Sequence, residues 1–126
     1  MIGLGRRVRV FAYAEAVDMR KSFDTLSAVV REHVGRDVID GALYLFIGKD
    51  RRRAKVLFWD GTGLCVLAKR LAKGRFAAPW TLNKKTHVLE WTTSELALFL
   101  EGSEVVGRIA LSPPAWTPEE RRVTFT

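Results

Sequence analysis

Two apolar runs separated by a short break with two glycines form the clearest pattern in the chain. The first run is Val56–Trp59, the second is Leu64–Ala68, and Asp60-Gly61-Thr62-Gly63 lies between them. Short apolar runs across such a break predict a β-hairpin, because glycine accepts the positive φ that a tight connection needs. We expect the Asp60 carboxylate to bond the amides of this turn.

A further apolar run precedes the hairpin. Ala42–Ile47 is continuously apolar rather than alternating, which predicts a strand that is covered on both faces. Gly48–Arg53 is polar and indicates the turn into the next strand, Lys55–Trp59. Together with the hairpin, these segments predict a three-stranded antiparallel meander over about residues 42–70.

A helical pattern occupies residues 19–34. Asp18 is expected to cap its N-terminus, and Gly35 stands where a C-terminal glycine stop belongs. Upstream, Val8–Tyr13 carries β-forming residues and predicts a strand. The apolar positions of the helix recur every three or four residues along one stripe: Met19, Phe23, Leu26, Val29, Val30 and Val34.

The C-terminal part has weaker signals. Lys73–Lys85 resembles a loop, and His87–Trp91 predicts a short strand. Thr92 or Thr93 then caps a short helix over about residues 93–101 that stops at Gly102. Val105–Leu111 is consistent with a last strand or a loose segment, and residues 112–126 have the polar, proline-containing composition of a mobile tail.

These elements predict an α+β fold in a single domain over residues 1–111, followed by the tail. We expect an antiparallel sheet with the 42–70 meander at its centre, the 19–34 helix across one face, and the short C-terminal helix. The residues predicted to form the core are Leu26, Val30, Leu45, Ile47, Leu57 and Leu67.

Composition indicates a cytoplasmic protein. Of 126 residues, 48% are hydrophobic and 28% are charged, which is ordinary for a globular domain. A single cysteine excludes an intramolecular disulfide and fits a reducing compartment. No run approaches the roughly 20 apolar residues of a membrane span. Three early arginines also interrupt any signal peptide: Arg6, Arg7 and Arg9.

The sequence shows no pattern typical of catalysis. His33 and His87 lie far apart without neighbouring ligands, so no metal site is expected. Cys65 lies inside an apolar strand, which favours a small buried hydrophobe over a nucleophile. Gly61-Thr62-Gly63 lacks the length and the lysine of a phosphate-binding loop. We therefore expect a protein without cofactor that is not an enzyme.

The charge of the chain indicates more about its function than these residues do. The net charge is +7 and the isoelectric point is about 10.1, which suggests a polyanionic partner, either nucleic acid or an anionic membrane face. Eleven lysines and arginines lie between Lys49 and Lys85, against only Asp50 and Asp60. Because this excess of nine exceeds the net charge of the whole chain, the positive charge is concentrated around the hairpin.

This cluster is the candidate nucleic-acid-binding site. A solvated basic surface that protects a sheet edge is the simpler alternative. If residues 61–63 form the loop, Lys55 lies opposite Lys69 on one face, and such like charges are unfavourable without a polyanion or good screening. Two aromatic residues could stack on bases or pack in the core, whereas Trp59 is expected in the core. The candidate residues are Arg51, Arg52, Arg53, Lys55, Lys69, Arg70, Lys73, Arg75, Phe76 and Trp80.

Several segments resemble one known family. Asp18–Leu26 is similar to its helix motif, in which glycine is more common at the position of Ser22. Val56–Cys65 resembles its hairpin motif, with a matching Lys69–Phe76 behind it, and Thr93–Gly102 resembles its closing helix. The family is the small TnpB-like accessory protein, the second open reading frame, of the bacterial insertion-sequence-sixty-six elements. The resemblance covers about residues 1–102.

The resemblance implies a protein that is encoded beside a separate, larger transposase and is needed for transposition. It carries no catalytic residue onto this chain. We expect an accessory protein of DNA recombination that binds duplex DNA, with weak sequence specificity, or a DNA–transposase complex through the basic hairpin. The alternative is an adaptor that contacts the transposase without binding DNA itself. A membrane-surface role ranks third, because the basic residues lie on strands and turns rather than on an amphipathic helix.

Overall fold

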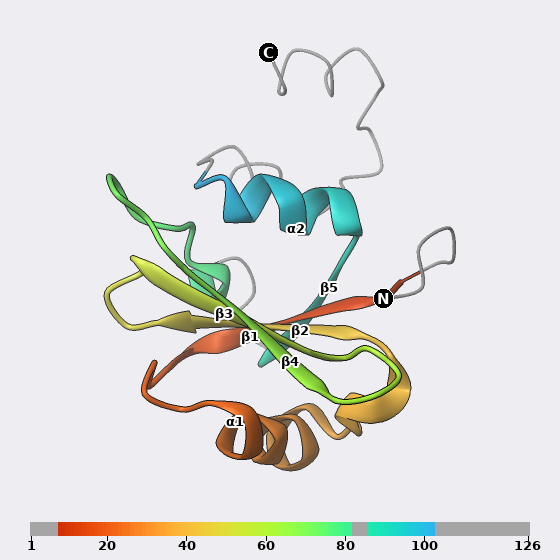
Figure 1. Ribbon diagram of the computed structural model, residues 1–126. Helices are drawn as coiled ribbons and strands as arrows, with labels where there is room; N and C mark the ends of the chain where they lie inside the picture. Colours follow the sequence, from red (N-terminus) through yellow and green to blue (C-terminus); the bar gives the residue numbers. More distant parts are fainter. Residues whose placement is uncertain (1–7, 82–85, 103–126) are drawn as a thin grey trace.

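In the computed structural model, which describes residues 8–81 and 86–102, five strands form one sheet in the order β4-β3-β2-β1-β5 (Figure 1). β2, β3 and β4 pair antiparallel with their sequence neighbours, as the meander predicted. β2 lies in the middle of the sheet and β4 at one edge. The strands are β1 (Val10–Val17), β2 (Leu43–Gly48), β3 (Arg53–Trp59), β4 (Leu64–Arg70) and β5 (Val88–Trp91).

The strand from the N-terminal part completes the sheet in a mixed arrangement. β1 pairs parallel with β2 and antiparallel with β5. A parallel pair requires a crossover connection, and the helical segment between β1 and β2 supplies it. The α+β class is confirmed. The meander occupies one half of this sheet, because β1 and β5 add to the free side of β2.

The crossover contains helix α1 (Phe23–Val29), which continues as a π-helix, η1 (Val30–Val34). Gly35, at φ 75°, ends it and donates a hydrogen bond of 2.8 Å from its N–H to the Val30 carbonyl. Ser22, not Asp18, is the N-cap, so the helix begins four residues later than predicted. Asp18 instead accepts the Arg20 N–H at 2.9 Å, a local bond of the kind that competes with helix formation.

Helix α2 (Thr93–Leu100) begins with a capping box. The Thr92 hydroxyl accepts the Glu95 N–H at 3.1 Å, and the Glu95 carboxylate accepts the Thr92 N–H at 2.8 Å. Thr92 is therefore the cap, of the two threonines considered, and Gly102 follows the helix at φ 80°. Two short 3₁₀ helices complete the described chain, η2 (Val38–Asp40) and η3 (Pro79–Thr81).

The sheet has a hydrophobic core on each face, with α1 on one side and α2 on the other (Figure 1). β2 contributes alternate residues to both cores and is buried along nearly its whole length, as its continuous apolar run predicted. The α1 side contains Phe11, Tyr13, Val17, Met19, Leu26, Val30, Val38, Ala42, Tyr44, Phe46 and Leu57. The α2 side contains Val10, Ala12, Ala14, Leu45, Ile47, Ala54, Val56, Phe76, Leu89, Trp91, Leu96, Leu98 and Phe99.

Five of the six predicted core residues are buried, and the sixth is not. Leu67 is 50% exposed, so its assignment to the core is wrong. It lies opposite Val56, which places it on the α2 side, but on edge strand β4 it is beyond the elements that cover that face. The confirmed residues are Leu26, Val30, Leu45, Ile47 and Leu57.

None of the helices among the described residues is long and apolar enough to cross a membrane. The predicted segment Val105–Leu111 and the predicted tail over residues 112–126 lie outside the described residues.

Candidate nucleic-acid interface

The β3–β4 hairpin positions most of the predicted site. Its strands end at the pair Trp59–Leu64, so the connection is the four residues from Asp60 to Gly63. The Asp60 carboxylate accepts the backbone N–H groups of Thr62 and Gly63 at 2.9 and 3.0 Å and the Thr62 hydroxyl at 2.9 Å. These bonds, the one from the Thr62 N–H above all, lower the pKa of Asp60 to about 2. The expected carboxylate-bonded turn is confirmed.

The register of the hairpin differs from expectation. Lys55 lies opposite Ala68 and Lys69 lies opposite Ala54, so the two lysines are on opposite faces of the sheet. The predicted Lys55–Lys69 pair is therefore wrong. A loop of four residues rather than three moves the register by one position, and a shift of one residue turns every side chain to the other face.

The same register brings two arginines together. Arg53 and Arg70 are direct cross-strand partners on the α1 side of the sheet, and Lys55 follows Arg53 on that face. Asp50 Oδ2 lies 3.4 Å from the Arg53 guanidinium, and the Lys55 ammonium donates to the Lys21 carbonyl at 2.7 Å. Arg70 is exposed and has no ion pair or hydrogen bond from its side chain to any described residue. Like charges at directly opposite positions are destabilising, so this face favours an anion.

Lys69 is held on the other face. Its ammonium donates to the Leu100 carbonyl in the last turn of α2, where a cation satisfies a free carbonyl and the negative end of the helix dipole. The lysine is still exposed. It therefore fixes the end of β4 to α2 and also presents positive charge there.

Backbone hydrogen bonds bring the remaining basic residues to the same end of the meander. The Leu71 N–H donates to the Arg52 carbonyl at 2.8 Å and the Phe76 N–H to the Arg51 carbonyl at 2.5 Å, which places segment 71–76 beside the β2–β3 turn. Six of the eight side chains are exposed, and Arg51 and Lys55 are partly buried. We call this set the basic end: Arg51, Arg52, Arg53, Lys55, Lys69, Arg70, Lys73 and Arg75.

The two aromatic candidates do not join the basic end. Phe76 is fully buried and stacks on Phe99, with ring centroids 4.8 Å apart, so it is a core residue and cannot stack on a base in this fold. Trp80 is partly buried against the α2-side core. The run of charge before Phe76 suggested a surface segment, but the chain turns inward at this residue.

Cys65 is partly buried on β4. Burial raises the pKa of its thiol, and so does its proximity to the Asp60 carboxylate. The thiol is therefore held protonated, which does not suit a nucleophile.

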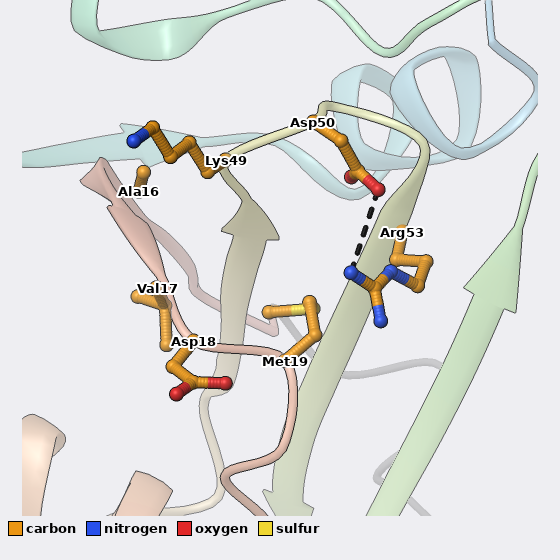
Figure 2. A pocket seen from close by; sticks show the side chains of 7 residues that line it. All are labelled: Ala16, Val17, Asp18, Met19, Lys49, Asp50 and Arg53. Carbon is orange, nitrogen blue, oxygen red and sulfur yellow. Dashed lines mark ion pairs between the residues drawn. The ribbon is translucent and has the colours of Figure 1, made fainter.

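Two neighbouring hollows lie at the basic end on the α1 side. The first has a volume of about 530 Å³ and is lined by Ala16, Val17, Asp18, Met19, Lys49, Asp50 and Arg53 (Figure 2). The second has a volume of about 310 Å³ and is lined by Met19, Arg53, Ala54, Lys55, Ala68, Lys69 and Arg70. Met19 and Arg53 line both hollows and separate them.

The β1–α1 loop forms a wall of these hollows, although its sequence pattern did not indicate a part of the site. Asp18 and Met19 fit the predicted helix, whereas they lie beside the β2–β3 turn. A Cβ on Gly48 would be 2.7 Å from Met19 Cγ, so a larger residue at this position would force the Met19 side chain or the loop to shift. The Asp18–Leu26 motif was the available signal, but the helical spacing of its apolar residues extended the predicted helix over the loop.

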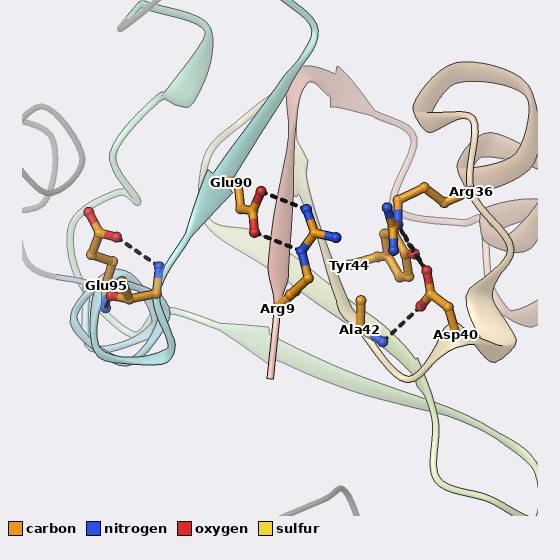
Figure 3. Close-up of polar contacts among 8 residues, drawn as sticks. Arg9, Arg36, Asp40, Ala42, Tyr44, Glu90 and Glu95 are labelled. Atoms are coloured by element: carbon orange, nitrogen blue, oxygen red, sulfur yellow. Dashed lines mark hydrogen bonds and ion pairs between the residues drawn. The ribbon is translucent and has the colours of Figure 1, made fainter. Parts of the chain in front are cut away.

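A second polar cluster, at the opposite end of β2, is structural. Arg9 forms two hydrogen bonds with Glu90, and Asp40 accepts both the Tyr44 hydroxyl at 2.6 Å and the Arg36 guanidinium at 2.9 Å (Figure 3). Burial, together with the bond to Asp40, raises the pKa of Tyr44 well above its usual value. These charged groups satisfy one another, which fixes the elements that carry them and leaves no free charge for a ligand.

The chain is similar to known sequences over most of its length. The model of a family described as IS66 Orf2 like protein matches residues 8–108. Uncharacterized protein y4hO of Sinorhizobium fredii is 38% identical over 79 residues, which are 63% of this chain and 69% of that protein. Uncharacterized protein y4jC of the same organism is 29% identical over 102 residues, which are 81% and 85% of the two chains. No solved structure matches the chain significantly.

Proposed function

Because the chain belongs to the family of IS66 Orf2-like proteins, we propose that it carries out its accessory role in transposition by binding DNA at the basic end. The observation that carries this proposal is the cross-strand pair of Arg53 and Arg70. The two arginines occupy directly opposite positions there, and Asp50 is the one carboxylate in ion-pair contact with either among the described residues. A phosphate between them would relieve the repulsion.

The contacts would be made mainly to backbone phosphates. Arginine and lysine side chains that grip phosphates position a protein on DNA without reading its sequence. The basic end supplies six exposed cations from two strands, a turn and segment 71–76. We therefore propose weak sequence specificity on duplex DNA, with specificity for the element supplied by the transposase.

Binding to labelled duplex DNA tests this function. Fluorescence anisotropy would compare a duplex from the end of the element with a random duplex of equal length, each with and without the transposase of the same element. Direct binding predicts similar affinity for both duplexes in the absence of transposase. If neither duplex binds without transposase, the proposal of direct DNA binding is wrong.

One observation favours the second function, an adaptor that contacts the transposase. Leu67 is half exposed on edge strand β4 and shares the α2 side of the sheet with Lys69, two residues later. An apolar residue beside an exposed lysine is a surface that suits an acidic protein partner. The adaptor predicts that the chain reaches DNA only when transposase is present, and that Leu67→Ser weakens this recruitment.

A further inference from the structure

The two hollows at the basic end differ in chemistry although they share a wall. The first hollow combines the apolar groups of Ala16, Val17 and Met19 with two carboxylates and two cations. The second has Arg53, Lys55 and Arg70 around the small side chain of Ala68, and no carboxylate. Ala54 and Lys69 also line it, but the register places their side chains on the other face of the sheet. Their common wall is Met19 and Arg53, so one ligand could extend from the first hollow into the second.

The second hollow suits a phosphate group. The pair of Arg53 and Arg70 lies on one rim with Lys55 next to it, and Ala68, opposite Lys55, leaves the space open. Arginine presents its donors as a planar fork that matches phosphate oxygens. Since Arg70 has no partner among the described residues, its donors are available without breaking a bond.

The first hollow suits a planar, partly polar ring. A volume of about 530 Å³ is within the range of pockets that bind small ligands. The Met19 thioether is a polarizable group that packs well on aromatic rings. Asp18 already accepts four hydrogen bonds from Arg20 at its two oxygens. Asp50 accepts the Arg52 N–H and lies 3.4 Å from the Arg53 guanidinium, and because a carboxylate has about four lone-pair sites it can accept a further donor, such as the amino group of a base.

We propose that the two hollows together bind a single unstacked nucleotide, with the base in the first and its phosphate in the second. This inference rests on the proposed function and specifies its substrate. A base inside a duplex is stacked and paired, so it cannot enter a hollow without being extruded. The site would therefore bind an unpaired nucleotide, at a frayed or single-stranded stretch of DNA, while the rest of the basic end contacts the neighbouring backbone.

The experiment uses the full chain and four probes of increasing size: inorganic phosphate, a deoxynucleoside, its 5′-monophosphate, and a short single-stranded oligonucleotide. Binding is followed by chemical-shift changes of the backbone amides. We expect the monophosphate to bind at least about tenfold more tightly than phosphate or the nucleoside alone. Shifts should occur in the loop with Asp18 and Met19 as well as in β4.

Substitutions that fill one hollow at a time test the two parts of the site independently. Ala16 and Ala68 are exposed alanines, one in each hollow, and Ala97 is an exposed alanine on α2 at the other face of the sheet. Ala16→Phe should reduce monophosphate binding to the level of phosphate, and Ala68→Leu should weaken both. Ala97→Phe is the control and should change neither. The smaller Ala16→Leu gives the same test if the phenylalanine variant fails to fold.

The outcomes distinguish this inference from the proposed function. If the monophosphate binds no better than phosphate, or if Ala16→Phe binds it like the wild type, the nucleotide site is wrong. The duplex measurements then still stand, because they depend on the basic end as a whole. If duplex DNA, oligonucleotide and phosphate all fail to bind, the proposed DNA-binding function fails together with the inference.

Discussion

Arg53 on β3 and Arg70 on β4 lie directly opposite each other in the antiparallel register. The Asp50 carboxylate, 3.4 Å from the Arg53 guanidinium, neutralises part of their charge. Two positive charges at directly opposite positions repel each other, whereas charges that only keep a protein soluble can be spread over its surface. An anion placed here removes a repulsion as well as gaining an attraction.

The salt dependence of duplex binding should depend on Arg70. If about five or six cations contact phosphates, the slope of log K against log salt is about −5, and Arg70→Ala should reduce its magnitude by about one. The thermal midpoint should stay equal or rise slightly, because the side chain is exposed and unbonded within the described chain and its removal ends the repulsion with Arg53. Arg31→Ala, an exposed arginine on η1, is the control. If both variants change the slope equally, the charge acts diffusely and the basic end is not the site.

Leu26 and Leu67 should differ sharply in their effect on stability. Leu26 is fully buried between α1 and the sheet, so Leu26→Ala should lower the free energy of unfolding by about 2–5 kcal/mol. Leu67 is 50% exposed on the edge strand, and Leu67→Ala should cost no more than about 0.5 kcal/mol. Urea denaturation of both variants measures this. A large loss at Leu67 would mean that another part of the chain covers it.

Gly48 should be required for packing of the β1–α1 loop. A methyl group there would meet Met19 Cγ at 2.7 Å, so Gly48→Ala should destabilise the protein by about 1–3 kcal/mol through overpacking. In a Met19→Ala background the same substitution should cost less, because the clashing atom is gone. A double-mutant cycle in urea measures the coupling. Equal costs in both backgrounds would show that Met19 is not what the methyl group meets.

The hairpin turn should lose stability in acid. The pKa of Asp60 is about 2 in the folded protein against an ordinary value of 3.8, so the folded state binds the proton less readily than the unfolded chain. The stabilisation is present above about pH 4 and is lost as the pH falls towards 2. As the pH is lowered from about 4 to about 2, the thermal midpoint of the wild type should decrease more than that of Asp60→Ala. Parallel decreases would contradict a role of the carboxylate in holding the turn.

Sequence patterns predicted the turns, caps and single strands well, because each of these depends on residues that are close together in the chain. The Asp60–Gly63 turn, the Thr92 cap and the buried run of β2 follow from residue types at fixed positions. The parallel pairing of β1 with β2 did not follow, because nothing within β1 indicates its partner. The start of α1 was misplaced because Met19 fits the helical stripe although it packs on Gly48 instead.

The sequence indicated the eight cations of the basic end but not their arrangement, and its two aromatic candidates, Phe76 and Trp80, pack against the core instead. Charge along the chain located the basic end, since all eight cations belong to segments that backbone bonding brings together. Which face each residue occupies depended on a loop length that differed by one residue, and this replaced the expected Lys55–Lys69 pair with Arg53–Arg70. The two hollows depend on contacts between distant segments, which no single stretch of sequence specifies.

The two cores are completed at different points of synthesis. All the buried residues of the α1 side lie between Phe11 and Leu57, whereas the α2 side also needs Phe76, Trp91 and Phe99. A growing chain can therefore assemble one core while the opposite face of the sheet, with Leu45 and Val56, is still uncovered. Exposed apolar strands of this kind are prone to aggregation. If translation pauses before α2 is made, the sheet stays covered on one face only, so a pause there prolongs the exposure of its apolar strands.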